Sequence, residues 1–410
     1  MDIGFGEALL IVGLLLAVAA ALSGVMRGTA LSISVLAVSL GIALAATDVI
    51  SVDAEDPGVL EMVELALILT LFSDGMFVER ELLGRHWGPP ARALAIAMPI
   101  TMGLLALGAY LVFPELSWAE AFLLAAILSP TDPVVTSTVV TAQRVPALIR
   151  HTLNLESGLN DGLALPFVLF FLVLATPGGD AGQEAVELLG EAAVGAAIGI
   201  ALGVIGGRLH SGLPGGGITA RYEGIYAVGF GLAAFGLADV TFGNGLIAAF
   251  VAGLALAREE HDVPDSFVAF AENVSSIFQV ITFFLFGALI VATGYHESIW
   301  GLLAFIPFAL LIARPVAVLA ALPGTRLPRS QKLFIAWFGP KGVASMLFAL
   351  LVLDAPVGEG DLVFDIAAFV ILSSILAHGL TDTVGARWVG RRMEEREEGE
   401  AKGVPSRLLD

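Results

Sequence analysis

The sequence predicts an all-α, polytopic integral membrane protein of about 13 transmembrane helices, with inverted repeats and interrupted, crossing helices in its core. Its composition, its succession of apolar runs and the placement of its basic residues predict this class. Of 410 residues, 57% are hydrophobic and 14% are charged, and the mean hydropathy is +0.89. A soluble domain cannot bury that much apolar surface, so the chain belongs in a bilayer.

Apolar runs of spanning length follow one another along the whole chain. The first run lacks a basic n-region and a cleavage site, so we expect a retained span rather than a signal peptide. The runs lie at about 7–22, 29–46, 59–78, 93–113, 119–140, 151–175, 185–207, 223–239, 243–257, 271–292, 299–322, 331–353 and 363–385.

Basic residues fall only in alternate loops when the N-terminus is placed outside. The positive-inside rule then predicts an external N-terminus and a cytoplasmic C-terminus in the plasma (inner) membrane. Of the 20 Lys and Arg residues, 18 lie on this one side: Arg27, Arg80, Arg85, Arg92, Arg144, Arg150, Arg208, Arg221, Arg258, Arg326, Arg329, Lys332, Arg387, Arg391, Arg392, Arg396, Lys402 and Arg407.

The formal charge of −19 does not indicate a nucleic-acid partner. Acidic residues concentrate in the connecting segments 48–56 and 180–191 and in the tail segment 394–400, where they are solvated. Membrane lipid is the expected surroundings. The chain has no cysteine, which excludes disulfides, thiol catalysis and Cys-ligated metals.

Polar residues interrupt the span at 151–175. Glu156 and Asn160 are four residues apart, as are Ser157 and Asp161, so each pair shares one helix face. An ionised group near the bilayer centre costs about 2.5–3.5 kcal/mol on insertion scales, so such groups usually mark an ion path. Ser157 and Asp161 can offer oxygens to one ion, while Glu156 points toward a different neighbour.

Two spans are broken by prolines or glycines around a single charge. Pro130-Thr131-Asp132-Pro133 interrupts the run at 119–140, and Gly339-Pro340-Lys341-Gly342 interrupts the run at 331–353. Unwound backbone at membrane depth is tolerated where it lines a cavity or binds an ion. Corresponding breaks in two halves of a chain are typical of inverted-repeat transporters with a midplane site. We expect Asp132 either to share a cation with Asp161 or only to stabilise helix N-termini.

The two basic residues outside the loops, Arg314 and Lys341, lie near the middle of apolar spans. We expect them to neutralise buried partners. A buried carboxylate favours its protonated form and can hold a proton or a dehydrated cation, but not both. A carboxylate that binds either of two cations, but never both at once, is the minimum that exchange requires. Hard oxygen ligands suit alkali ions.

These motifs resemble the monovalent cation–proton antiporters, specifically the sodium/proton exchanger branch. The resemblance covers essentially the whole chain. The matching pieces, in order, are Leu71-Phe72-Ser73-Asp74-Gly75, Thr131-Asp132-Pro133, Glu156-Ser157, Asn160-Asp161, Arg314-Pro315 and the glycine-rich motif at Lys341. Asn160 before Asp161 resembles the electroneutral branch, because the electrogenic branch usually has a second Asp there. Lys341 departs from the Leu-Arg that the exchangers often show.

The resemblance implies a homodimer that exchanges Na⁺, or alternatively Li⁺ or K⁺, for H⁺ and needs no cofactor. Asp161 would carry both ions, with Asp132, Thr131 and Ser157 coordinating the cation. Asn160 and Lys341 would support the site, Glu156 would pair with Arg314, and Asp74 is a further candidate. Residues 1–385 would form the transmembrane domain, with ion-binding core helices at about 93–175 and 299–385 and scaffold helices from the remainder. Residues 386–410 would form a short charged cytoplasmic tail.

Three other function classes stay open at this point. A cation channel would need a pore lined by polar rings or carbonyl filters, which isolated carboxylates on separate helices do not provide. An ion-coupled organic-anion symporter could share the fold. An intramembrane enzyme built on Ser157 would need a histidine base, and the sequence places no intramembrane histidine for that role.

Overall fold

A computed structural model describes residues 5–401 except 27–32, 54–55, 83–87, 133–143, 179–180, 213–217, 259–264, 294–298, 326 and 354. The described residues form helices and no strands, as the sequence predicts. In the first part of the chain the helices are α1 (Phe5–Met26), α2 (Ile33–Ala46), α3 (Pro57–Leu82), α4 (Gly88–Arg92), the π-helical turn η1 (Ala93–Ala97), α5 (Met98–Val112), α6 (Trp118–Ile127) and α8 (Ala147–Ala175).

The second part of the chain continues in the same way. Its helices are α9 (Ala181–Gly212), α10 (Ala220–Asp239), α11 (Gly245–Leu256), α12 (Asp265–Thr293), α13 (Ile299–Pro307), the π-helical turn η4 (Phe308–Ala313), α14 (Arg314–Ala321), α15 (Arg329–Trp337), α16 (Val343–Leu353) and α17 (Gly360–Ala401). Each predicted apolar run overlaps one of the described helices or a helix interrupted part-way, although the run at 119–140 continues beyond the described residues.

Six helical segments among the described residues are long and apolar enough to cross a membrane. They are Gly88–Val112, Ala147–Ala175, Gly182–His210, Asn273–Thr293, Ile299–Ala321 and Gly360–Arg396. Shorter apolar helices accompany them, so the expected total of about 13 spans stays a prediction.

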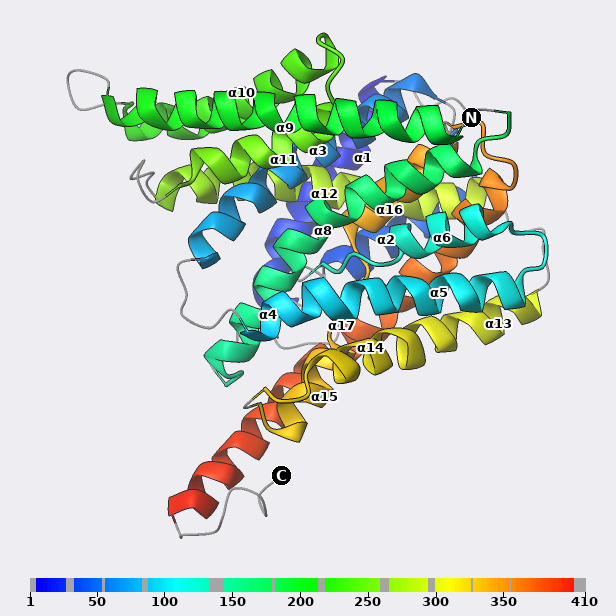
Figure 1. Cartoon of the computed structure of the whole chain (residues 1–410), viewed down its shortest axis with the longest axis vertical. Coiled ribbons are helices and arrows are strands. Elements are labelled where there is room, and N and C mark those ends of the chain that lie inside the picture. Colours follow the sequence, from blue (N-terminus) through cyan, green and yellow to red (C-terminus); the bar gives the residue numbers. More distant parts are fainter. Residues whose placement is uncertain are drawn as a thin grey trace.

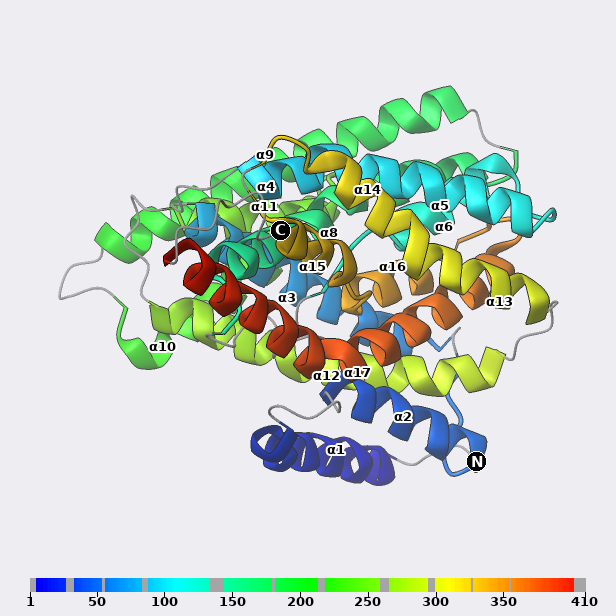
Figure 2. The same cartoon turned by 90° about the horizontal axis from the view of Figure 1, so that it is seen from below.

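The helices pack into two neighbouring groups. α11 lies against α9 and α3, and α12 lies against α2, whereas α6 lies against α5 and α8. α3 also contacts α8, which joins the two groups. α1 lies at the edge, in contact with α2 and α12 (Figure 2). The division into core and scaffold helices stays a prediction.

Two π-helical turns occur at matching places in the chain. η1 ends two residues before Pro99, and η4 ends two residues before Pro315. A proline cannot donate to the carbonyl one turn earlier and its ring crowds that carbonyl, so a widened turn relieves the clash. Each π turn leads into the helical segment that precedes a broken span. This parallel supports the expectation of a repeat.

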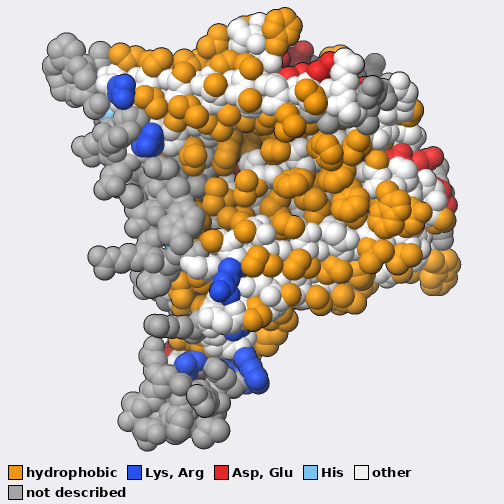
Figure 3. All heavy atoms as spheres, viewed as in Figure 1, with side chains coloured by type: hydrophobic (Ala, Val, Ile, Leu, Met, Phe, Trp, Pro, Cys, Tyr) orange, Lys and Arg blue, Asp and Glu red, His pale blue; other side chains and the backbone are white. Residues whose placement is uncertain are grey.

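The two ends of the helix bundle differ in charge. In Figure 3, Lys and Arg side chains gather at the left, Asp and Glu side chains gather at the right, and an apolar band separates them. Figure 1, drawn from the same side, shows that α6 lies toward the right and α15 near the bottom of the bundle.

α17 is one continuous helix from Gly360 to Ala401, and its last turns extend beyond the bundle (Figure 1). It passes residue 386, where the sequence predicts the charged tail to begin, without a break. Ala386 and Val389 are buried in a small apolar cluster with α15, so the first turn of this tail is packed against the rest of the protein.

Candidate ion-binding site

α8 supplies the four polar residues predicted from the run at 151–175. Glu156, Ser157, Asn160 and Asp161 are all buried, and Asp161 is 6% exposed. α8 is continuous through them although it contains Gly158, Gly162 and an internal proline at 166. The helix therefore fixes the mutual orientation of these side chains.

Residues 128–132, which follow the end of α6, lie against the break between α15 and α16, and we call this contact the crossing. α6 ends at Ile127, and α15 and α16 are separated by residues 338–342. The backbone N–H of Asp132 donates to the carbonyl of Pro340 (2.8 Å). In return, the N–H of Val343 donates to Oδ2 of Asp132 (3.2 Å). Backbone groups that leave a helix need other partners in an apolar interior, and each break supplies them to the other.

The two charged side chains at the crossing each lie at a helix end whose dipole has the opposite sign. Asp132, 8% exposed, faces the N-terminus of α16, where a carboxylate is favoured by the helix dipole. The ammonium of Lys341 donates to the carbonyl of Pro130, just beyond the C-terminal end of α6, at 3.3 Å. A cation is favoured at that end of a helix. Lys341 therefore binds a backbone carbonyl directly, and the buried carboxylate of Asp161 lies within electrostatic range of its ammonium, as expected of a residue that neutralises buried partners.

Glycine permits this close approach. A Cβ on Gly342 would overlap the side chain of Asp132, and a Cβ on Gly339 would overlap the guanidinium of Arg314. Both glycines of the second break therefore leave room for a charged side chain from another element.

Thr131 links the first break to α8. The hydroxyl of Ser157 donates to the carbonyl of Thr131, and Nδ2 of Asn160 donates to Oγ1 of Thr131 (2.7 Å). The structure thus brings together Thr131, Asp132, Ser157, Asn160 and Lys341. The sequence pairs Asn160 with Glu156 on one face, but the amide contacts Thr131.

Asp161 lies beside this crossing, and one of its carboxylate oxygens is available to bind a proton or a cation. Among the described residues, Oδ1 of Asp161 and Oδ1 of Asn160 are buried and accept no hydrogen bond. Asp161 is in electrostatic range of the carboxylates of Asp74 and Asp132 and of the ammonium of Lys341. Concentrated negative charge with unused oxygens favours a bound proton or a hard cation. Asp74, on α3, is half-buried.

Glu156 and Arg314 face each other away from these oxygens. Nη1 of Arg314 lies 2.7 Å from Oε1 of Glu156, and both side chains are less than a tenth exposed. Nε and Nη2 of Arg314 have no hydrogen-bond partner among the described residues. The guanidinium therefore depends on Glu156 for compensation of its buried charge.

Sequence patterns did not identify the backbone oxygens of the site. The carbonyls of Pro130, Thr131 and Pro340 all accept hydrogen bonds at the crossing. The prolines were the sequence signal for these oxygens, because a proline breaks a helix and leaves nearby carbonyls without their helical hydrogen-bond donors. Pro133 lies outside the described residues.

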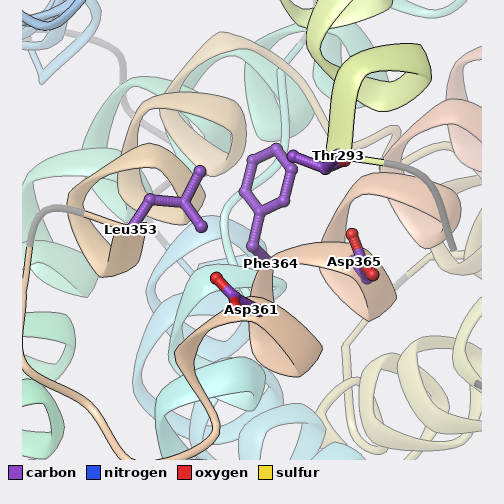
Figure 4. A pocket seen from close by; sticks show the side chains of 5 residues that line it. All are labelled: Thr293, Leu353, Asp361, Phe364 and Asp365. Carbon is purple, nitrogen blue, oxygen red and sulfur yellow. The ribbon is translucent and has the colours of Figure 1, made fainter. Parts of the chain in front are cut away.

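A cavity of about 230 Å³ lies elsewhere, lined by Thr293, Leu353, Asp361, Phe364 and Asp365 (Figure 4). Asp361 and Asp365 both project from the beginning of α17, one helical turn apart (Figure 4). This cavity contains none of the residues predicted for the ion site.

Comparison with known proteins identifies the family. The profile of the family described as "Sodium/hydrogen exchanger, transmembrane" matches residues 6–385. The chain belongs to this family. The sodium/proton exchanger resemblance in the sequence is therefore confirmed, and the chain is a multi-pass membrane protein of this family.

Individual exchangers are similar in sequence and in fold. A K(+)/H(+) antiporter NhaP of Alkalimonas amylolytica is 24% identical over 328 residues, covering 79% of this chain and 56% of that protein. A probable Na(+)/H(+) antiporter of Schizosaccharomyces pombe is 27% identical over 367 residues, covering 78% of this chain and 47% of that protein. The chain thus spans about half the length of these curated relatives.

The sodium proton antiporter MjNhaP1 of Methanocaldococcus jannaschii, solved at pH 8, has a similar fold. Its TM-score is 0.75 at 19% identity, and the alignment covers 94% of this chain and 100% of that chain. At this identity the likeness concerns the fold alone.

Proposed function

We propose that this exchanger moves a monovalent cation, Na⁺ in the first instance, against H⁺ by alternating access, with a stoichiometry of one to one. The observation that carries the proposal is the buried carboxylate of Asp161, which has an unused oxygen beside the crossing of two broken helices. Asp132, Thr131 and Ser157 would complete the cation site, with Asn160 and Lys341 in support. Bound proton and bound cation would exclude each other on Asp161.

The choice of cation needs a direct test, because the relatives include proteins named for K⁺ and proteins named for Na⁺. Purified protein in liposomes with an internal pH dye should report a saturable pH change on addition of Na⁺, Li⁺ or K⁺. We expect the lowest apparent KM for Na⁺. Conductance without saturation would favour a channel, and pH changes that need an organic anion would favour a symporter.

We expect exchange to be electroneutral. Asn160 is neutral, so Asp161 is the carboxylate that must change its occupant in each cycle. One cation and one proton then cross in opposite directions with no net charge. The membrane potential is worth about 2.3 kcal/mol per charge per 100 mV, and none of it would act on the cycle. Clamping the potential to zero with valinomycin and K⁺ in Na⁺-exchange liposomes should leave the rate nearly unchanged. A transport current on a supported membrane would indicate that a second charge moves in each cycle. Asp132 would then be the first candidate for a second carboxylate that changes its occupant.

We expect the apparent affinity for the cation to fall as the pH falls. Protons compete with the metal ion for Asp161, so the apparent KM for Na⁺ should rise up to tenfold per pH unit while protonation dominates, with Vmax affected less. Initial rates measured over a matrix of pH and Na⁺ concentrations check this competition. A KM independent of pH alongside a falling Vmax would place proton and cation on separate groups.

The topology and assembly remain part of the proposal. The segregation of basic and acidic side chains to opposite ends supports a cytoplasmic C-terminus and an external N-terminus in the plasma (inner) membrane (Figure 3). We also propose a homodimer. Protease accessibility of the C-terminal end in sealed right-side-out vesicles tests the orientation, and the mass of the detergent-solubilised protein tests the dimer.

A further inference from the structure

α17 faces the second break with two buried polar side chains. Ser374 and His378 are four residues apart, so they share one face of the helix. Ser374 is 0% exposed and His378 is 2% exposed. Neither residue belongs to the ion site proposed above.

These two side chains bind the backbone groups that the break releases. Pro340 has no N–H, and the break leaves the N–H of Lys341 without a helical partner, whereas the carbonyl of Trp337 accepts from the N–H of Gly339 (2.9 Å) and can accept a second hydrogen bond. The N–H of Lys341 donates to Oγ of Ser374 at 2.9 Å. Nε2 of His378 lies 2.9 Å from the carbonyl oxygen of Trp337, the last residue of α15, and donates to it in the tautomer that carries the proton on Nε2. α17 therefore binds both sides of the break.

The two contacts are connected to each other. Oγ of Ser374 lies 3.1 Å from Nδ1 of His378, and Nδ1 is also 2.7 Å from the carbonyl of Ser374. The His378 ring packs against the Trp337 ring with centroids 4.8 Å apart. The indole N–H of Trp337 donates to Oγ1 of Thr381 at 3.0 Å. One face of α17 thus holds the carbonyl, the ring and the N–H of Trp337.

The same break supplies three groups to the ion site. Pro340 offers its carbonyl to Asp132, Lys341 reaches Pro130, and Val343 donates to the carboxylate of Asp132. A shift of the break along α17 would move all three contacts together. We infer that Ser374 and His378 are positioning residues for cation binding, acting through the backbone of residues 337–341 on Asp132 and Lys341.

Transport kinetics test this inference, which rests on the proposed function for this readout. Ser374→Ala removes the acceptor for Lys341 and should raise the apparent KM for Na⁺ about fivefold, the effect of one hydrogen bond, with a smaller change in Vmax. Ser374→Thr keeps a hydroxyl and should restore most of the affinity. Ser373→Ala is the matched control, since the neighbouring serine is half-buried and its hydroxyl makes no hydrogen bond within the described part of the chain.

His378 is tested in the same way. His378→Gln keeps an N–H donor in reach of the Trp337 carbonyl and should stay close to the wild-type KM. His378→Leu removes the donor and should behave like Ser374→Ala. Equal KM values for His378→Gln and His378→Leu would overturn the role of the His378 hydrogen bond. The side chain would then act only by packing against its neighbours.

A second readout does not depend on transport. Hydrogen–deuterium exchange of the Lys341 amide, measured in nanodiscs, should be faster in Ser374→Ala than in the wild type or in Ser373→Ala. Faster exchange with an unchanged KM would overturn the coupling to the ion site, and unchanged exchange would overturn the contact itself. If the wild type showed no cation–proton exchange, the proposed function would fail, while the amide measurement would still decide whether Ser374 holds the break.

Discussion

Replacing Asp161 with Asn will abolish cation–proton exchange and leave the protein folded in the membrane. The amide keeps the shape of the side chain but cannot bind and release a proton or compensate a dehydrated cation. Asp161 is buried beside Asp132 and Lys341, and we expect no other carboxylate to take over its position. The pH-dye assay in liposomes should show a rate indistinguishable from that of empty liposomes.

Asp239→Asn is the matched control for this experiment. It removes one carboxylate from the exposed end of α10, which contributes no residue to the proposed ion site, and this variant should exchange like the wild type. Both variants should elute as the wild type does in size-exclusion chromatography. Normal exchange by a folded Asp161→Asn protein would rule out the mechanism proposed above.

Glu156 and Arg314 should behave as a single unit in stability measurements. Removing one partner leaves a buried charge uncompensated, which typically costs about 3–5 kcal/mol. Glu156→Gln and Arg314→Gln should therefore each lower the melting temperature strongly. The double substitution should be less harmful than the sum of the two, and a double-mutant cycle of thermal unfolding in detergent measures the difference.

A surface pair provides the comparison for this cycle. Arg392 and Glu395 form an ion pair at 3.3 Å with side chains 59% and 65% exposed. Exposed pairs contribute only about 0.2–1 kcal/mol, so the same cycle on Arg392 and Glu395 should show coupling near zero. Additive losses at Glu156 and Arg314 would mean that their contact contributes as little as the surface pair does.

Local sequence patterns located the two breaks well. Prolines and glycines remove backbone donors or relax helix geometry wherever they occur, so Pro130 and Pro340 marked the interruptions without knowledge of their neighbours. The same holds for the helical runs, because a bilayer requires about 20 apolar residues to cross it in a helix. Asp161 was identified for a related reason: a carboxylate in an apolar span is costly unless it has a function.

The partners of these groups could not be found in the same way. Lys341 binds the carbonyl of Pro130, and Asn160 binds Thr131, although 211 and 29 residues separate the two members of each pair. Backbone carbonyls are the same at every position of the chain, so no residue pattern says which of them a distant side chain will reach.

By itself, the sequence determined the helical class, the positions of the breaks and the buried charges, because each follows from the chemistry of a short segment in lipid. Only the tertiary structure decided that the two breaks lie against each other, that Asp132 meets the N-terminus of α16, and that Ser374 and His378 contact the break between α15 and α16. These contacts join segments far apart in the chain, and their geometry depends on how all the helices pack at once.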